Sequence, residues 1–433
     1  MKQSYAVILC FIVQLSCKEA PPEPPPHQVS IQLSVEDASC TEAWLKVSLT
    51  DASQPRTVAV QQDGQRVVTA QMTTADSVFV VEGLLPRHTY SYVAQRLRDT
   101  SVIDVSSPVQ ARTMDTTSHD FSFQVDTLGE GGSSTLYDVV IINDTLAYAA
   151  GEVYMKDSAG TIDPQTYNLM KWNGNIWTPL RIQFYTVCGQ TSRTPYPANA
   201  VFAFGASDVW IAMRGDQVAR WNGNTQTATM CLPVSFTISK LWGENPSSIY
   251  AVGAGGNILH YDGSSWARVE SRTTLALHDV FGSTDNRTGK KEIICVASNW
   301  SFPEGKMLLR LDQGTATQLS DLGLPWSIAA IWHVPCRKYV VVGDGVYQTN
   351  TLGSVWAKYS AIPPLYTTSV AGIAVNDVVI GGAFWDLVHF NGRTWRSYFP
   401  FAPGSFTAVA RGGRAIFAVG GSGDRAIVAR GTQ

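Results

Sequence analysis

The chain has 433 residues, of which 15% are charged and 45% are hydrophobic, with 36 glycines and 21 prolines. This length exceeds what one ordinary hydrophobic core absorbs, and the composition is that of a packed, turn-rich protein, which excludes disorder for most of the chain. The formal net charge of −3 supplies no cationic field for a polyanion, so we expect no nucleic-acid partner.

The N-terminus has the features of an export signal. Lys2 precedes an apolar run over residues 6–13, which is too short to cross a bilayer but suits a signal-peptide core. Leu15-Ser16-Cys17 resembles the lipobox of bacterial lipoproteins, although Gln14 stands where that family prefers an aliphatic residue. The resemblance implies removal of residues 1–16 and a lipid on Cys17. The alternative is ordinary secretion with cleavage elsewhere and a free Cys17.

Residues 17–28 are rich in proline and are expected to form an extended stalk with little ability to pack. Lys18-Glu19 also resembles the surface-export signals of some lipoproteins of the Bacteroidetes lineage. These features favour a protein of the cell envelope, at the outer membrane or cell surface, whose membrane contact is the N-terminal lipid.

Five cysteines remain after cleavage and acylation: Cys40, Cys188, Cys231, Cys295 and Cys336. None forms a CxxC pair, so no zinc site is predicted. Cys295 lies in an apolar run and is interpreted as a core residue. Cys188 and Cys231 lie in irregular stretches and could form a disulfide in an oxidising compartment.

Residues 29–115 contain short strands of alternating polarity separated by turns, which predicts a small β-sandwich. The segment Gly83-Leu84-Leu85-Pro86-Arg87-His88-Thr89-Tyr90 resembles the L-x-P-x-x-x-Y stretch of fibronectin type III domains, with Tyr90 at the tyrosine corner. That resemblance makes Trp44 and Tyr90 core residues and the domain a spacer.

Residues 116–433 repeat themselves, which indicates a propeller or a solenoid. Each unit has an apolar opening strand, six have a second strand that is apolar on both faces, and four have a third strand that ends in an aromatic residue before Asn-Gly or Asp-Gly. We predict that these dipeptides form type I′ hairpin turns. The pattern resembles β-propeller repeats of bacterial surface lipoproteins and implies an all-β, seven-bladed propeller. The opening strands align in one column: Val139, Val201, Leu241, Val280, Ile331, Ile373 and Val409.

The last unit has only three strands before the chain stops at Gln433. Residues 121–127, just before the first unit, show strand alternation. We predict that this segment completes the last blade and closes the ring, because an open sheet edge is costly.

Recognisable catalytic motifs are missing from the sequence. Asp138 and Asp279 occupy equivalent positions in their units, and a carboxylate pair is what glycosidases use, but the other five units carry no acid there. His260 and His389 share a repeat position that holds Lys or Arg in other units, which indicates a polar rim and no metal site. No nucleophile elbow or phosphate-binding loop is present, so no catalytic residue, metal or cofactor is predicted.

Two function classes remain. The favoured one is a non-enzymatic binding or scaffold lipoprotein whose propeller contacts protein or glycan; the alternative is a propeller-type glycoside hydrolase or polysaccharide lyase acting outside the cell. We expect ligands at the channel mouth, near the variable loops 155–167, 184–197, 283–291 and 299–306. Aromatic residues in these loops are candidates for ligand contact, namely Tyr185, Tyr196, Trp300 and Phe302.

Overall fold

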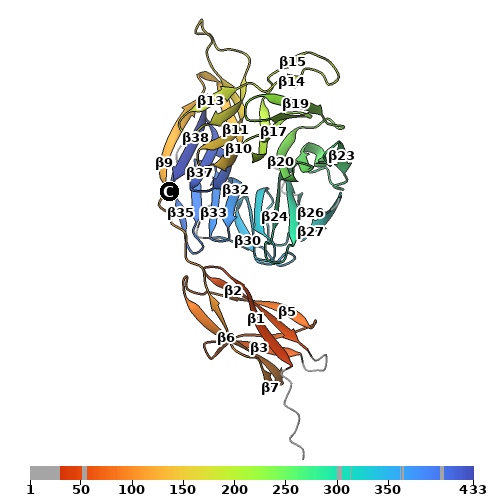
Figure 1. The fold of residues 1–433 in the computed structure, drawn as a ribbon, viewed down its shortest axis with the longest axis vertical. Coiled ribbons are helices and arrows are strands. Elements are labelled where there is room, and N and C mark those ends of the chain that lie inside the picture. Colours follow the sequence, from red (N-terminus) through yellow and green to blue (C-terminus); the bar gives the residue numbers. More distant parts are fainter. Residues whose placement is uncertain are drawn as a thin grey trace, which may run out of the picture. The chain divides into compact units, whose positions relative to one another are not determined.

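The fold is shown as a computed structural model in Figure 1. It describes residues 30–50, 56–299, 305–312, 314–360, 362, 365–399 and 404–433. The expected signal peptide and stalk, the lipid site Cys17, and the loop aromatics Trp300 and Phe302 therefore lie outside the described residues. Among the helices of the described ranges, none is long and apolar enough to cross a membrane. The chain divides into two compact units, the larger of which includes Thr113–Gln433.

The smaller unit contains two antiparallel sheets. In the first sheet the order is β1 (Ile31–Ala38), β2 (Glu42–Leu49) and β5 (Asp76–Glu82). In the second it is β4 (Gln65–Gln71), β3 (Thr57–Gln62), β6 (Thr89–Arg98) and β7 (Ser101–Val105), and β8 (Val109–Arg112) also pairs with β6. Trp44 and Tyr90 are buried, as expected of core residues.

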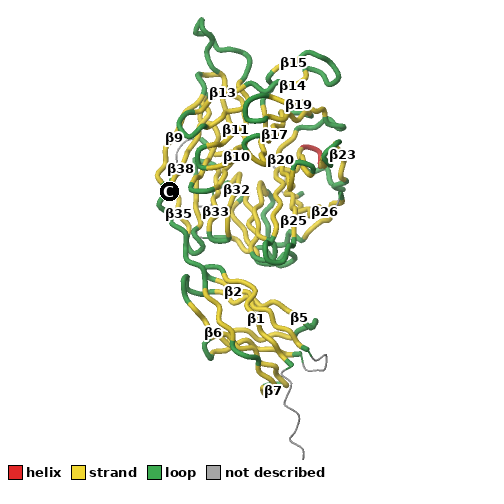
Figure 2. Tube along the Cα trace, in the orientation of Figure 1, coloured by secondary structure: helices red, strands yellow, loops and turns green. Residues whose placement is uncertain are grey.

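Seven four-stranded antiparallel sheets account for most of the larger unit within the described residues. Figure 2 shows that this unit is built almost wholly of strands and loops. The first four sheets are β10 (Gly131–Asn143), β11 (Leu146–Tyr154), β12 (Tyr167–Trp172), β13 (Trp177–Leu180); β16 (Ala198–Gly205), β17 (Asp208–Met213), β18 (Gln217–Trp221), β19 (Gln226–Cys231); β20 (Ile238–Asn245), β21 (Ser248–Gly253), β22 (Ile258–Tyr261), β23 (Trp266–Val269); and β24 (Leu277–Thr284), β25 (Lys291–Ser298), β26 (Lys306–Asp312), β27 (Thr315–Leu319).

The remaining three sheets are β28 (Ile328–Val334), β29 (Lys338–Gly343), β30 (Gly345–Thr349), β31 (Ala357–Lys358); β32 (Thr367–Ala374), β33 (Asp377–Gly382), β34 (Leu387–Phe390), β35 (Trp395–Ser397); and β36 (Ser405–Gly412), β37 (Ala415–Ser422), β38 (Arg425–Thr432), β9 (Ser122–Leu128). The first strand of each sheet, here called the inner strand, contacts the inner strand of the next sheet. Because the last inner strand, β36, also contacts the first, β10, the sheets close into a ring.

The closing strand is confirmed. β9 pairs antiparallel with β38, from Ala426 opposite Leu128 to Thr432 opposite Ser122. The two strands, far apart in sequence, lie side by side in Figure 1. Asp126 on β9 reinforces the pairing, since its Oδ2 accepts hydrogen bonds from Arg430 Nε at 2.7 Å and from Trp177 Nε1 of the first sheet at 3.0 Å. The pairing covers the strand edge that the last three strands would otherwise expose.

Each inner strand has a break in register at the same place, which fixes the repeat alignment. In the fourth sheet the break precedes Asp279, and Val280 pairs with Cys295. In the sixth sheet the break precedes Ser369, and Val370 pairs with Ile380. The predicted column residue Ile373 is therefore wrong by three positions: Val370 is buried, whereas Ile373 is 53% exposed. The small residues around both positions in β32 leave the hydrophobic pattern ambiguous.

The predicted type I′ turns are also wrong. Four residues separate the paired Trp172 and Trp177, and only Gly174 among them has a positive φ, of 91°. Asn173 instead acts through its side chain, whose Oδ1 accepts hydrogen bonds from the backbone N–H groups of Asn175 and Ile176. The side chains of Asn222, Asp262 and Asn391 accept the same pair of backbone hydrogen bonds in their own turns. The repeated Asn or Asp is therefore a side-chain acceptor that stabilises a turn longer than two residues.

Candidate functional site

The inner strands enclose a central channel with a cavity volume of about 710 Å³, lined by residues of all seven sheets. The residue after each register break forms a ring of seven positions around this channel. In sheet order these positions are Asp138, Ala200, Lys240, Asp279, Ala330, Ser369 and Ala408. All of them except Ala200 line the cavity.

Asp138 is almost completely buried, with 2% of its surface exposed. Its Oδ1 accepts a hydrogen bond from the next backbone N–H, of Val139, at 2.9 Å, and forms an ion pair with Lys240 Nζ at 2.6 Å. Its Oδ2 accepts a hydrogen bond at 3.0 Å from the backbone N–H of Val201 in the second sheet. The carboxylate therefore connects three sheets.

Asp279 repeats the backbone part of this arrangement. Its Oδ1 accepts a hydrogen bond from Val280 N at 2.9 Å, and its Oδ2 accepts one from Ile331 N of the fifth sheet at 3.0 Å. Burial raises the pKa of Asp279, although Lys240 partly opposes that effect. Burial by itself would lower the pKa of Lys240, but the carboxylates of Asp138 and Asp279 raise it above its usual range. The lysine thus remains charged between two acids.

Small side chains occupy the rest of the ring. Ala200, Ala330 and Ala408 carry no polar side-chain atom. Ser369 Oγ accepts a hydrogen bond at 3.1 Å from Val409 N of the seventh sheet, so it makes the same kind of link between sheets as the two aspartates. The ionisable side chains of the ring therefore come from the first, third and fourth sheets, and the opposite wall is short and uncharged.

One end of the ring carries the long loops, and we call it the loop face. In a four-stranded antiparallel sheet, the start of the inner strand, the link between the second and third strands, and the end of the fourth strand lie at the same end. The predicted ligand loops 155–167 and 184–197 and the described part of 299–306 belong to this face. Loop 283–291 joins the first strand of its sheet to the second and therefore lies at the opposite end.

A cluster around Glu152 lies at the loop face of the first two sheets. Its carboxylate accepts hydrogen bonds from the hydroxyls of Tyr137 and Tyr154 and lies 3.6 Å from Arg214 Nη1. Burial, with the neighbouring Glu152, raises the pKa of Tyr137 to about 12. Tyr137 and Arg214 line the channel, so this cluster places aromatic and charged groups at its mouth.

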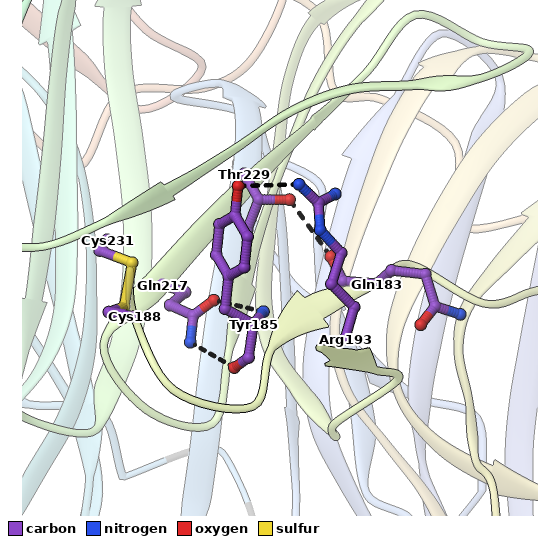
Figure 3. Close-up of a disulfide and its surroundings, with 7 residues drawn as sticks. All are labelled: Gln183, Tyr185, Cys188, Arg193, Gln217, Thr229 and Cys231. Carbon is purple, nitrogen blue, oxygen red and sulfur yellow. Dashed lines mark hydrogen bonds between the residues drawn. A yellow bond between two sulfur atoms is a disulfide. The ribbon is translucent and has the colours of Figure 1, made fainter. Parts of the chain in front are cut away.

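The insertion between the first and second sheets contains the short strands β14 (Phe184–Tyr185) and β15 (Arg193–Thr194) (Figure 3). A disulfide joins Cys188 in this insertion to Cys231 at the end of β19. The buried Gln217 side chain accepts a hydrogen bond from Tyr185 N and donates one to Tyr185 O. The insertion is thus held covalently and by hydrogen bonds.

The side chain of Arg193 lies against the ring of Tyr185, with the guanidinium carbon 4.4 Å from the ring centroid and Nη2 donating to the Tyr185 hydroxyl at 2.8 Å. Tyr196, the other candidate in this insertion, is half-buried, and its carbonyl accepts a hydrogen bond from Asn168. The structure therefore places Tyr185 and Tyr196 on one insertion at the loop face.

Trp242 lines the channel, and Trp332 holds the equivalent position in the fifth sheet, but the contacts of both rings are structural. A Cβ added to Gly282 would lie 2.3 Å from the Trp242 ring, and one added to Gly372 would lie 2.7 Å from the Trp332 ring. Each tryptophan therefore packs on a glycine of the following sheet. The aromatic residue that follows the column position in the sequence was the visible signal for these contacts.

His389 contradicts the prediction of a polar rim at its repeat position, because it is completely buried. Its Nε2 lies 3.2 Å from Asp377 Oδ1, and its Nδ1 lies 2.9 Å from His119 Nδ1. Arg411 also pairs with Asp377, through two hydrogen bonds of 2.8 and 2.9 Å. Repetition alone could not show this burial, since the segment that contains His119 precedes the repeats. Over the described ranges, no three His, Cys, Asp or Glu side chains group as metal ligands would.

The chain matches no protein-family model and no curated protein. Among solved structures it is similar to YCF48 bound to D1 peptide, with 14% identity and a TM-score of 0.53 over 74% of this chain and 100% of the other. It is also similar to YCF48 from Cyanidioschyzon merolae, with 14% identity and a TM-score of 0.50 over 71% and 98%. The WD40 β-propeller domain of Doa1 matches at 12% identity and a TM-score of 0.48, over 72% and 97%. The larger unit of this chain has the β-propeller fold.

Proposed function

We propose that this protein is a non-catalytic binding or scaffold lipoprotein of the cell envelope, whose propeller contacts a protein or glycan ligand at the loop face. The observation that carries the proposal is the engagement of the two channel carboxylates. Asp138 and Asp279 each accept backbone hydrogen bonds from two sheets, and Asp138 also pairs with Lys240. These contacts give both acids a structural role.

A glycosidase needs a different arrangement. Its two carboxyl groups flank the bond to be broken, and one must transfer a proton while the other attacks the sugar or activates water. Asp138 accepts hydrogen bonds from two backbone donors and from an ammonium group, and these contacts occupy lone pairs that catalysis would use. Asp279 has the raised pKa of a potential general acid, and this favours the hydrolase or lyase as the second candidate.

The loop face supports a binding role because its largest insertion is rigidly held. The Cys188–Cys231 disulfide and the Gln217 hydrogen bonds fix the insertion, and a preorganised loop loses less conformational entropy on binding. Tyr185 and Arg193 provide a stacked pair suited to sugars or to polypeptide. A propeller of similar fold, YCF48, has been solved with a peptide, which is a precedent for a polypeptide ligand on this architecture.

The segments that precede the propeller would attach it to the membrane. A lipid on Cys17, a proline-rich stalk over residues 17–28 and a fibronectin type III-like spacer would hold the propeller away from the membrane. The strand orders β1-β2-β5 and β4-β3-β6 with β8, found in the smaller unit, support the likeness to that domain type. Labelling with a palmitate analogue should mark the wild type and spare Cys17→Ala; equal labelling of both would disprove the anchor.

Binding and catalysis are separated by one experiment. The lipid-free chain is incubated with arrays of peptides and of bacterial and host glycans, and both retention and product release are followed. We expect retention without product, and weaker retention for Arg193→Ala, with Arg414→Ala as a matched control, because the exposed Arg414 lies between β36 and β37 at the opposite end of the ring. Steady accumulation of cleaved product, abolished by Asp279→Asn, would establish the hydrolase or lyase instead.

A further inference from the structure

The channel ring contains an internal repetition, whose sixth position the structure assigns to Ser369. Sheets one to three contribute Asp138, Ala200 and Lys240, and sheets four to six contribute Asp279, Ala330 and Ser369. The two aspartates make the same backbone hydrogen bonds, with equal distances of 2.9 Å to the following N–H and 3.0 Å to the next sheet. The two halves differ at the third position, where serine replaces lysine.

That difference leaves Asp279 without an ammonium group at ion-pair distance, although the charge of Lys240 also acts on it from further away. Asp138 Oδ1 lies 2.6 Å from Lys240 Nζ. The corresponding residue two sheets beyond Asp279 is Ser369, whose short side chain accepts a hydrogen bond from Val409 N. Within the described part of the chain, Asp279 has no ion pair shorter than 4 Å. Together Asp138, Lys240 and Asp279 carry one more negative than positive charge when all are ionised.

The surroundings of Asp279 have room and suitable chemistry for a cationic ligand group. Asp279 is 8% exposed and lines the cavity of about 710 Å³, which also contains Ala330, Ser369 and Ala408. Val280 and Val370 line the same cavity and provide apolar surface. A carboxylate oxygen with one hydrogen bond retains acceptor capacity for another donor, and a buried carboxylate gains most from a cationic one.

We propose that Asp279 binds a primary ammonium group on an aliphatic stem, carried by a ligand that enters the channel, in the position that Lys240 takes at Asp138. The ammonium donates to Asp279, and the stem packs against the alanine and valine side chains that line the cavity around it. The inference rests on the proposed binding function and gives it a ligand chemistry. A lysine side chain in a peptide and a free diamine share that chemistry.

The test measures binding by calorimetry to the full lipid-free chain. Its probes are 1,5-diaminopentane and the peptide Gly-Lys-Gly, with Gly-norleucine-Gly as the uncharged control for the stem. We expect the lysine peptide or the diamine to bind and the norleucine peptide to bind at least tenfold more weakly. A preference for the peptide over the diamine would identify a polypeptide source, and the reverse a small amine.

Two substitutions locate the site. Asp279→Asn removes the charge and should weaken amine binding at least tenfold. Ser369→Lys places an internal ammonium where the ligand group would lie, so it should also weaken binding at least tenfold and raise the melting temperature above that of Ser369→Met, which loses the same hydrogen bond from Val409 N. Ser369→Met, with its long uncharged side chain, is the matched control. Unchanged amine affinity in both Asp279→Asn and Ser369→Lys would overturn the inference.

The outcomes distinguish a wrong ammonium site from a wrong binding function. If the wild type retains a ligand on the peptide or glycan arrays but neither amine binds, the ammonium site is wrong and the binding role stands. If nothing is retained on any array and no amine binds, both are wrong.

Discussion

The carboxylate of Asp138 in the first sheet accepts a hydrogen bond at 3.0 Å from the backbone N–H of Val201 in the second. Asp279 and Ile331 repeat this link between the fourth and fifth sheets, and Ser369 and Val409 repeat it between the sixth and seventh. Side-chain acceptors therefore connect neighbouring inner strands, which make no backbone ladder with each other. The residues that invited a catalytic interpretation are part of the framework of the ring.

Replacing Asp138 should therefore destabilise the propeller. Asp138→Ala leaves the Val201 N–H and the Lys240 ammonium without their acceptor in a buried site, and we expect the free energy of unfolding to fall by about 3–5 kcal/mol. Asp279→Ala, the matched variant, leaves the equivalent backbone N–H donors of Val280 and Ile331 without their acceptor but breaks no ion pair, so its loss should be smaller. Urea unfolding of the two variants measures the difference. Equal losses would show that Lys240 adds nothing to the role of Asp138.

Loss of β9 should open the ring. A chain that begins at Gly131 lacks the strand that covers β38, together with the hydrogen bonds of Asp126 to Arg430 and Trp177. We expect a lower melting temperature or aggregation relative to a chain that begins at Thr116, because an uncovered edge exposes unpaired backbone groups. Light scattering during thermal melting compares the two chains. The closing role would be refuted by identical curves.

The disulfide should stabilise the insertion at the loop face. Cys188 and Cys231 are 43 residues apart in the sequence, a separation for which loop-closure entropy predicts about 4 kcal/mol. The double variant Cys188→Ser with Cys231→Ser should lose a comparable amount in urea unfolding, and reductant should have the same effect on the wild type. Cys336→Ser is the control, since Cys336 is a free and exposed thiol. A loss of equal size in the control would contradict the assignment.

Acid should weaken the propeller through His333. This side chain is completely buried, and burial lowers its pKa to about 4. The unfolded chain has a histidine pKa near 6.5, so it binds more protons than the folded chain between about pH 6.5 and pH 4. The stability of the folded chain is therefore full above about pH 6.5 and falls as the pH decreases towards 4. The loss should reach about 3 kcal/mol.

Urea midpoints measured from pH 7.5 to 4 give this profile, and His333→Gln should flatten it. Burial also lowers the pKa of His119, His260 and His278, so a smaller slope of the same sign should remain in the variant. A slope in His333→Gln equal to that of the wild type would assign the acid sensitivity to other groups.

The number of sheets and the closing strand were predictable because both depend on local patterns. Apolar opening strands mark each unit, and an aromatic residue before Asn-Gly or Asp-Gly marks four of them. The shortage of one strand in the last unit pointed to residues 121–127. The local pattern was insufficient where several small residues are adjacent, as in β32. The predicted column residue of the sixth sheet was therefore Ile373, whereas the structure has Val370 at that position.

The chemistry of the site depended on contacts between residues far apart in the sequence. Asp138 and Lys240 are separated by about a hundred positions, and His119 and His389 by 270, so no spacing rule could pair them. Repetition correctly placed Asp138 and Asp279 at equivalent positions. Whether each acid is paired, buried or accessible was decided by the closure of the ring, because desolvation and ion pairing depend on which side chains the other sheets bring into the channel.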